Sequence, residues 1–171
     1  MLTVRDAVGA DLDAVAAMRA QGWDDTYGPL IGAEVIGPLL DVAKHRRDIE
    51  RVMSEGTGLL LVAEEDGSRL AGFALSHLDA RREPYLESLH VRAARRDQGI
   101  GVTLLRATAE RWLAAGHRTL SLKVIAGNVA AMRFYERYAA EATGTVIQDW
   151  NGKPVESVIY GWSDLTKLPL G

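Results

Sequence analysis

Two glycines that follow an apolar strand and a run of arginines carry the clearest chemistry in this sequence. Gly99 and Gly101 come after residues 89–91 and the basic segment 92–96, and a long amphipathic helix is predicted to begin at Gly99. The first N–H groups of a helix lack intrahelical partners and lie at the positive end of its dipole, so they attract phosphate groups. Glycine has no Cβ atom, which lets a bulky anion approach the main chain. The turn therefore predicts a pyrophosphate-bearing ligand held by the backbone of Arg96, Asp97, Gln98, Gly99, Ile100, Gly101 and Val102.

Two common phosphate-binding motifs do not fit this turn. The dinucleotide-binding fingerprint has a third glycine or alanine where this sequence has Leu104, and it follows the first strand of a βαβ unit rather than a fourth strand. The P-loop requires lysine and then serine or threonine after its second glycine, but Val102 and Thr103 follow Gly101. For an isolated Gly-x-Gly, an ordinary tight strand-to-helix turn is the simpler interpretation.

Other segments give the turn a more specific meaning. The pattern Arg96-x-x-Gly99-x-Gly101 after an apolar strand resembles the acetyl-CoA pyrophosphate signature of the GNAT superfamily of N-acetyltransferases. Asn128-x-x-Ala131-x-x-Phe134-Tyr135-Glu136 resembles the segment of that superfamily that contacts the pantetheine arm. A looser pattern, Trp23-x-x-Thr26-Tyr27, is similar to the acceptor-side loop of a large bacterial subgroup. The order of predicted elements fits the superfamily across nearly the whole chain.

The resemblance implies that acetyl-CoA is the co-substrate and suggests which residues hold it. The main chain of Leu89, His90 and Val91 is expected to pair with the pantetheine arm as an added strand would. An N–H group at or near Val91 is expected to face the acetyl oxygen, in an oxyanion-type role. Asn128 is expected near the cofactor arm, and it is also well placed to cap the helix that follows it.

Amine acetylation further needs an acid for the leaving thiolate and a base for the amine. Tyr135 is the predicted general acid, because a phenol with an ordinary pKa of about 10 is protonated at neutral pH. A tyrosine that only fills the core beside Phe134 is the alternative. Glu87, on the strand that enters the glycine turn, is the predicted general base, with Glu83 as the alternative base. An equally weighted interpretation of Glu87 is a glutamate that is solvent-facing or paired with one of the neighbouring arginines, Arg81 and Arg82.

Strand alternation predicts which side chains share a face near this base. It places Glu87 on one face together with Tyr85, Leu89 and Val91. His90 is expected on the opposite face, and both His90 and His77 are interpreted as structural histidines. The sequence shows no spaced set of histidines or carboxylates that indicates a metal site.

Aromatic residues are candidates for the acceptor pocket. Trp23 and Tyr27 are expected to line it, although aromatic residues under a loop also form satellite hydrophobic clusters. Trp150, Tyr160 and Trp162 belong to the last predicted hairpin. They are compatible with a core position, with the acceptor groove or with a dimer surface.

The sequence departs from the superfamily pattern at two places. Ala139 and Ala140 stand where the superfamily usually has glycine and phenylalanine, so a different helix ending and a small residue in a core position are expected. Asp97 stands in the basic turn where a small residue is usual. Its carboxylate is expected to point away from the pyrophosphate or to pair with Arg95 or Arg96.

Composition limits the classes of protein to consider. The chain has 171 residues, 47% of them hydrophobic and 25% charged, which is typical of a single globular domain spanning residues 1–171. A net charge of −3 gives no reason to expect a nucleic acid or an anionic membrane as partner. The absence of cysteine excludes disulfides and an acetyl-cysteine intermediate. No signal peptide is evident, so a cytoplasmic location is expected.

The elements that must position these residues are read from periodicity and turn signals. Strands are predicted at residues 2–5, 59–65, 70–78, 85–91, 120–124, 142–150 and 154–162. Helices are predicted at residues 11–21, 34–54 and 99–115 and after Asn128, and residues 23–32 are predicted to form an irregular loop. The order βααβββαβαββ predicts an α/β fold with a mixed, mostly antiparallel sheet flanked by helices and splayed open between the fourth and fifth strands.

These observations predict an enzyme that transfers the acetyl group of acetyl-CoA to a primary amine by direct attack in a ternary complex. The acceptor is an amine of a small molecule or a peptide, and a homodimer is possible. Two alternatives remain open at this point. One is an acyl-CoA-binding regulatory or vestigial domain without turnover, and the other is a protein-interaction module that uses its aromatic hairpin.

Overall fold

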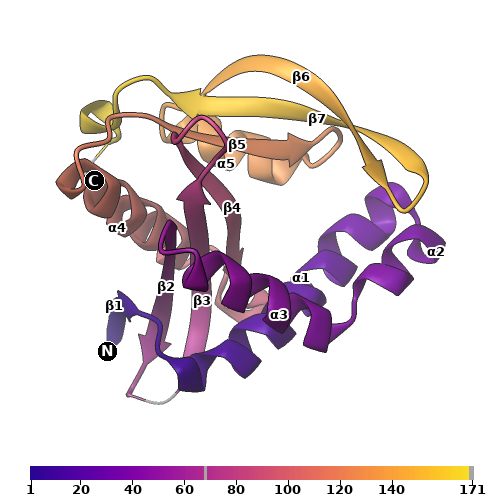
Figure 1. The fold of residues 1–171 in the computed structure, drawn as a ribbon, viewed down its shortest axis with the longest axis horizontal. Helices are drawn as coiled ribbons and strands as arrows, with labels where there is room; N and C mark the ends of the chain where they lie inside the picture. The colour runs from indigo at the N-terminus through magenta and orange to yellow at the C-terminus, as the bar shows by residue number, and fades with distance from the viewer. Residues whose placement is uncertain (68, 170–171) are drawn as a thin grey trace.

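Seven strands form one mixed sheet in the computed structural model, which describes residues 1–67 and 69–169 (Figure 1). The strands are β1 (Leu2–Asp6), β2 (Gly58–Glu65), β3 (Arg69–Leu78), β4 (Pro84–Val91), β5 (Leu120–Ile125), β6 (Glu141–Trp150) and β7 (Lys153–Trp162). Their order across the sheet is β1-β2-β3-β4-β5-β7-β6, and every neighbouring pair is antiparallel except β4 and β5. The predicted mixed, mostly antiparallel sheet is confirmed.

Helices cover both faces of this sheet. They are α1 (Leu12–Ile31), α2 (Ala33–Ile36), α3 (Val42–Ser54), α4 (Ile100–Ala114) and α5 (Val129–Arg137). Val62 and Phe73 pack against α1 and α3 on one face, whereas Leu61 and Ala74 pack against α4 on the other. Side chains on both faces of β2 and β3 are therefore buried, which explains the near-continuous apolar runs of these strands. None of the helices in the described residues is long and apolar enough to cross a membrane.

The helix after the glycine turn follows its predicted pattern closely. Ile100, Leu104, Thr108 and Trp112 recur every four residues along α4, and all four are buried. This apolar stripe holds the helix against the sheet. The stripe thereby places the first turn of α4 directly after the end of β4, where the predicted phosphate site lies.

The first helical region differs from its prediction. Residues 23–32, predicted to be a loop, continue α1 through Ile31, with Pro29 inside the last turn. The helix ends at Gly32, whose φ of 116° lies outside the range that other residues adopt readily. The aromatic residues at positions 23 and 27 are four apart on a helix face that packs against neighbouring elements, and this tertiary packing outweighs the loop signal of Gly28-Pro29.

The second predicted helix, residues 34–54, is divided in two. A short turn at Gly37–Leu39 separates α2 from α3, and Pro38 lies within it. The side chain of Asp41 then caps α3 by accepting hydrogen bonds from the N–H groups of Ala43 (2.9 Å) and Lys44 (3.2 Å). Proline followed by an N-cap residue is the signal for a helix start that the sequence prediction passed over.

The sheet opens between β4 and β5, as predicted. The two parallel strands pair only at Tyr85 and Ser121. On its other side β4 contains a β-bulge: Ser76 pairs with Leu86 and Leu75 with Ser88, so Glu87 has no partner on β3. A bulge bends its strand and increases the local twist, which moves the rest of β4 away from β5.

The end of α5 corrects one expectation about Ala139. This residue has a φ of 64°, in the left-handed region, and the N–H groups of Ala139 and Ala140 donate to the carbonyls of Glu136 and Tyr135 at 3.0 Å each. This is the Schellman ending that glycine usually supplies, so the helix ending is unchanged despite the alanine. Ala140 is 6% exposed, a small residue in the core as expected.

The left-handed alanine leads to a prediction about stability. Ala139→Gly is expected to raise the free energy of unfolding by about 1 kcal/mol, because an L-residue is strained in this conformation and the exposed methyl group of Ala139 is not needed for packing. Denaturant unfolding measures the change. The matched control is Ala17→Gly on the exposed face of α1, which should lower the free energy of unfolding by a similar amount. A fall in the free energy of unfolding at both positions would contradict the prediction.

Candidate active site

A cavity of about 290 Å³ lies where β4 and β5 diverge. Residues of α1, β4, β5 and α5, together with the first turn of α4, contribute to its walls. They include Tyr27, Glu87, Leu89, His90, Val91, Arg96, Gly101, Lys123, Asn128 and Tyr135. Nine of the fifteen site residues predicted from the sequence line this cavity, so the fold brings most of them to one place, whereas Lys123 was not predicted.

A second, larger cavity of about 520 Å³ borders the glycine turn. Arg96, Asp97, Gly99, Ile100, Gly101 and Val102 line it, whereas Gln98 does not. The N-cap of α4 is Gly99, with a φ of 80°. A Cβ atom on Gly101 would lie 3.4 Å from the Phe134 ring, so glycine allows α4 to begin close against α5. The first turn of α4 is therefore open to a ligand, as its N–H groups require for anion binding.

Arginines make this second cavity basic. Arg133 and Arg137 of α5 line it in addition to Arg96. Arg95, which also lines this cavity, pairs with Glu65 of β2, its Nε lying 2.7 Å from Oε1. Pairing of Asp97 with Arg95, one of the alternatives expected for this carboxylate, is therefore not observed. Asp97 is exposed and makes no ion pair within residues 1–67 and 69–169. The net charge around the turn is positive, which suits a pyrophosphate.

The backbone of β4 has one free edge along this cleft. Leu89, His90 and Val91 pair with β3 through Ala74, Phe73 and Gly72. On the side facing β5, the described residues provide no strand partner beyond Tyr85, and the Val91 carbonyl accepts a hydrogen bond from Arg96 Nε at 3.5 Å. Strand-edge N–H and C=O groups without partners can bind an extended chain as an added strand.

The bulge at Glu87 changes which side chains share a face. Tyr85 lies against His77, with ring centroids 5.6 Å apart, and Glu87 contacts Arg19 of α1, so both point to the α1 face. Leu89 and Val91 instead pack with the core on the α4 face. The predicted common face is therefore wrong beyond Glu87, because the extra residue of a bulge reverses the alternation.

His90 lies on the same face as Glu87, contrary to the prediction, but its surroundings fit a structural histidine. Its ring stacks on Phe73 at a centroid distance of 5.3 Å. It also lies against Gly22 of α1, where a Cβ atom would come within 2.3 Å of the His90 Nδ1. Burial lowers the pKa of His90 to about 4, so the ring is neutral at neutral pH.

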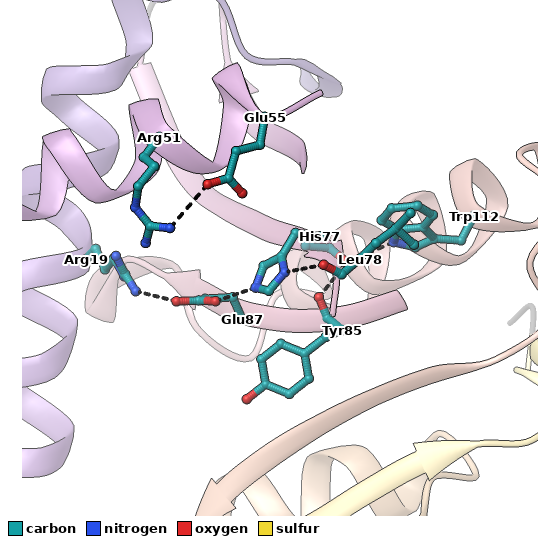
Figure 2. A network of polar contacts seen from close by, with 9 residues as sticks. Arg19, Arg51, Glu55, His77, Leu78, Tyr85, Glu87 and Trp112 are labelled. Carbon is teal, nitrogen blue, oxygen red and sulfur yellow. Dashed lines mark hydrogen bonds and ion pairs between the residues drawn. The ribbon is translucent and has the colours of Figure 1, made fainter. Parts of the chain in front are cut away.

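Glu87 has two partners that the sequence analysis did not foresee (Figure 2). Arg19 Nη2 lies 3.0 Å from its Oε1, and His77 Nε2 lies 2.6 Å from its Oε2. Hydrogen bonding to His77, with a further contribution from the charge of Arg19, lowers the pKa of Glu87. Arg81 and Arg82, the expected partners, do not contact it and lie in the exposed turn between β3 and β4.

The sequence contains a weak signal for each of these missed residues. Arg19 interrupts an apolar helix stripe between Val15 and Trp23, and its side chain is only 6% exposed. A buried arginine requires an anionic partner, so a carboxylate near α1 was to be expected. His77 follows Phe73 and Leu75 at alternate positions of a buried face, but no local pattern shows which strand residue lies opposite it.

Tyr135 projects from α5 into the cleft. Its side chain is 8% exposed, and burial raises its pKa above the ordinary value of a phenol. Asn128 caps this helix as predicted, accepting a hydrogen bond from the Ala131 N–H at 3.3 Å. The cap fixes the start of α5 and with it the position of the phenol relative to the free edge of β4.

Glu83, the alternative base, lies elsewhere. Its carboxylate accepts a hydrogen bond from the Thr119 hydroxyl at 2.5 Å, and it does not line the cavity between β4 and β5. The geometry therefore favours Glu87 over Glu83 for contact with a molecule in the cleft.

The predicted acceptor residues form part of an aromatic cluster. Trp23, Tyr27 and Trp150 lie with ring centroids 5.2–5.8 Å apart, so the tip of the β6–β7 hairpin packs on α1 (Figure 1). Tyr27 lines the cleft, whereas Trp23 lines a neighbouring cavity of about 260 Å³ with Trp150. Tyr160 and Trp162 are core residues, 3% and 4% exposed.

Comparisons with known proteins agree with this geometry. Residues 37–140 match the model of the acetyltransferase (GNAT) family. The chain is 26% identical to an uncharacterized N-acetyltransferase, YuaI, of Bacillus subtilis, over 98% of this chain and 96% of the relative. It is 28% identical to an L-methionine sulfoximine/L-methionine sulfone acetyltransferase of Pseudomonas aeruginosa, over 98% and 93% of the two chains.

Solved structures show the same fold. An N-acetyltransferase from Staphylococcus aureus superposes with a TM-score of 0.76 at 23% identity, covering 96% of this chain and 99% of the other. The PaiA N-acetyltransferase from Thermoplasma acidophilum, solved in complex with coenzyme A, gives 0.71 at 22% identity, with coverage of 92% and 98%.

Proposed function

The chain belongs to the acetyltransferase (GNAT) family, and on that premise we propose that it transfers an acetyl group from acetyl-CoA to a primary amine by direct attack in a ternary complex. The observation that carries the proposal is the free edge of β4, which leads from the cleft to the exposed first turn of α4. An extended arm followed by a pyrophosphate, joined in one ligand, matches these two features in the same order.

Each part of the cofactor has a chemically suitable set of residues. The basic turn and the N–H groups of residues 96–102 suit the pyrophosphate. The free edge of Leu89, His90 and Val91 suits the amides of the pantetheine arm. An N–H group at or near Val91 then stabilises the charge that develops on the acetyl oxygen. The thioester supplies an activated acetyl group, and the chain's residues hold it beside the amine.

Proton transfers at the two ends of the reaction are assigned to Glu87 and Tyr135. Both side chains line the same cavity, one from β4 and the other from α5. As the C–N bond forms, a proton leaves the amine towards Glu87, and as the C–S bond breaks, Tyr135 donates a hydrogen bond or a proton to the sulfur.

Activity itself is tested by incubating the protein with acetyl-CoA and a panel of amines while following thiol release. The panel contains L-methionine sulfoximine, other amino acids, polyamines and a peptide with a free N-terminus. Release that depends on the amine is the expected result. Binding of coenzyme A without release across the panel would support an acyl-CoA-binding domain instead, and no binding of coenzyme A would contradict both.

The charges facing the cleft favour an acceptor that carries an anionic group beside its amine. Glu87 is already paired with Arg19 and His77. Lys123 of β5 lines the cavity with its ammonium 5.5 Å from the Tyr85 ring centroid, and no carboxylate within the described ranges pairs with it. We therefore expect amino-acid-like acceptors to bind better than polyamines.

Lys123→Met tests this preference. The variant should raise the KM of a carboxylate-bearing amine by about 3-fold to 5-fold, the range of a partly exposed ion pair, and leave the KM of a neutral amine unchanged. Steady-state kinetics with amine pairs that differ only in the carboxylate measure the effect. Lys167→Met, outside both cavities, is the control. Equal changes for both amines would remove Lys123 from acceptor recognition.

A further inference from the structure

His77 makes two hydrogen bonds whose partners determine where its protons lie (Figure 2). Its Nδ1 lies 3.1 Å from the carbonyl oxygen of Leu78, and a carbonyl oxygen only accepts, so Nδ1 carries a hydrogen. Its Nε2 lies 2.6 Å from Glu87 Oε2. A close contact between two lone pairs is unfavourable, so one proton is held between Nε2 and Oε2.

The second oxygen of Glu87 is also occupied. Arg19 donates to Oε1 from a guanidinium that is 6% exposed and lies 5.2 Å from the Trp23 ring centroid. Arg19 is permanently charged, so it favours the ionised form of Glu87. The carboxylate is therefore most stable with the shared proton on His77, and in that state Glu87 is a poor acceptor for another proton.

We propose that Glu87 and His77 act as one proton-accepting unit, in which His77 positions Glu87 and takes up the proton that Glu87 receives from the attacking amine. This inference rests on the proposed function. The amine nitrogen forms its bond to the acetyl carbon and loses one proton to a Glu87 oxygen. Within the pair, Glu87 passes one proton to the Nε2 lone pair of neutral His77. His77 itself does not touch the amine, and it later releases the proton to solvent.

Titratable and charged groups surround His77 on several packed elements. Asp79 follows the end of β3, Tyr85 and Glu87 lie on β4, and Arg19 lies on α1. From α3, the Arg51–Glu55 ion pair lies in the same region (Figure 2). The facing residue of β2 is Gly58, which has no side chain to titrate. Within this set, Glu87 is the group that shares a hydrogen bond with the imidazole.

The direction of the pKa shifts fixes the sign of the pH dependence. The hydrogen bond to Glu87 raises the pKa of His77 above its ordinary 6.5, and the same bond lowers the pKa of Glu87. Between these two pKa values the pair already holds its proton and cannot accept one. Above the pKa of His77 the pair has lost this proton and can accept one from the amine. The value of kcat/KM should therefore rise with pH through an apparent pKa above 6.5, which belongs to the pair as a whole.

His77→Gln separates a positioning role in proton transfer from a purely structural role. Glutamine keeps an N–H donor for Glu87 but cannot take up a proton. We expect kcat to fall by about 10-fold or more at neutral pH, with the KM of acetyl-CoA changed by less than about 2-fold. The rise of kcat/KM with pH that comes from titration of the pair should disappear. The remaining pH dependence should reflect only deprotonation of the acceptor amine. The matched control, His117→Gln, lies beside Trp112 outside the cleft and should keep the wild-type profile.

An NMR titration of the imidazole tests the pair without any acetyl transfer. His77 should titrate above pH 6.5 in the wild type and at a lower pH in Glu87→Gln, which removes the charged partner that raises its pKa. A wild-type pH profile in active His77→Gln, or a His77 titration unaffected by Glu87→Gln, would overturn the inference while leaving the proposed function intact. Conversely, absence of thiol release with every amine, together with the expected titration, would refute the proposed function and with it the role of the pair in acetyl transfer.

Discussion

Replacing Tyr135 with phenylalanine is expected to lower kcat by about 10²-fold while changing the KM of acetyl-CoA by less than about 3-fold. The phenol lines the cleft at its α5 wall, whereas most of the predicted cofactor contacts come from β4 and the first turn of α4. Loss of the hydroxyl therefore removes a contact that matters when charge develops on sulfur, and it leaves the binding surface for the rest of the cofactor in place.

Burial of Tyr135 determines whether it acts as a hydrogen-bond donor or as a proton donor. Because burial raises its pKa, the phenol keeps its proton across the physiological range and is always ready to donate a hydrogen bond. The same shift makes complete proton transfer to the thiolate unfavourable, because the buried phenol is a weaker acid than a thiol. We therefore expect Tyr135 to act mainly by stabilising the leaving thiolate, and we expect no limb of the pH profile near neutrality to belong to it.

The control for this variant is another buried tyrosine. Tyr160 donates a hydrogen bond to Glu136 at 2.7 Å and does not line the cleft, so Tyr160→Phe should affect stability rather than kcat. Steady-state kinetics and thermal unfolding of both variants separate the two effects. An unchanged kcat in folded Tyr135→Phe would exclude Tyr135 from the reaction.

Features with a local periodic signal were predictable from the sequence. The stripe from Ile100 to Trp112, the Asn128 cap and the last hairpin each depend on residues within one or two elements, and the structure has all of them. The same holds for the glycine turn, whose conformation is set by Gly99 itself. Local physics determines these features, so the fold class followed from them.

Features that depend on contacts between distant segments were not predictable. Arg19 and Glu87 are 68 residues apart, and no periodic pattern pairs them. The bulge at Glu87 arises from the register between β3 and β4, and it reverses the predicted facing of Leu89 and Val91. The predicted loop at residues 23–32 became helix because Trp23 and Tyr27 pack on Trp150 of the last hairpin. Each error has the same origin, which is tertiary packing that overrides a local signal.

Replacing Glu87 with glutamine is expected to lower kcat/KM by about 10²-fold at pH 7, with a smaller loss as the pH rises. Glutamine has nearly the same shape, and its carbonyl oxygen still accepts from Arg19, so the buried guanidinium keeps a partner. What the variant lacks is a group that can receive the amine proton. At high pH the amine loses its proton to solvent without help, and the difference from the wild type should shrink.

Glu83→Gln is the matched control for that loss, because it makes the same chemical change on the same strand–turn segment. Glu83 bonds Thr119 outside the cleft, so its variant should keep kcat/KM within about 3-fold of the wild type across the whole pH range. A pH-independent loss in Glu87→Gln would indicate that the carboxylate only orders Arg19 and His77. A large loss in Glu83→Gln would instead identify Glu83, which precedes β4, as the base. A pH-dependent loss confined to Glu87→Gln is the expected outcome, because the bulge points the carboxylate of Glu87 at Arg19 and His77, whereas Glu83 lies before β4 and contacts Thr119. A carboxylate held between two cationic groups stays ionised, and it can relay a proton when one of those groups is able to release its own.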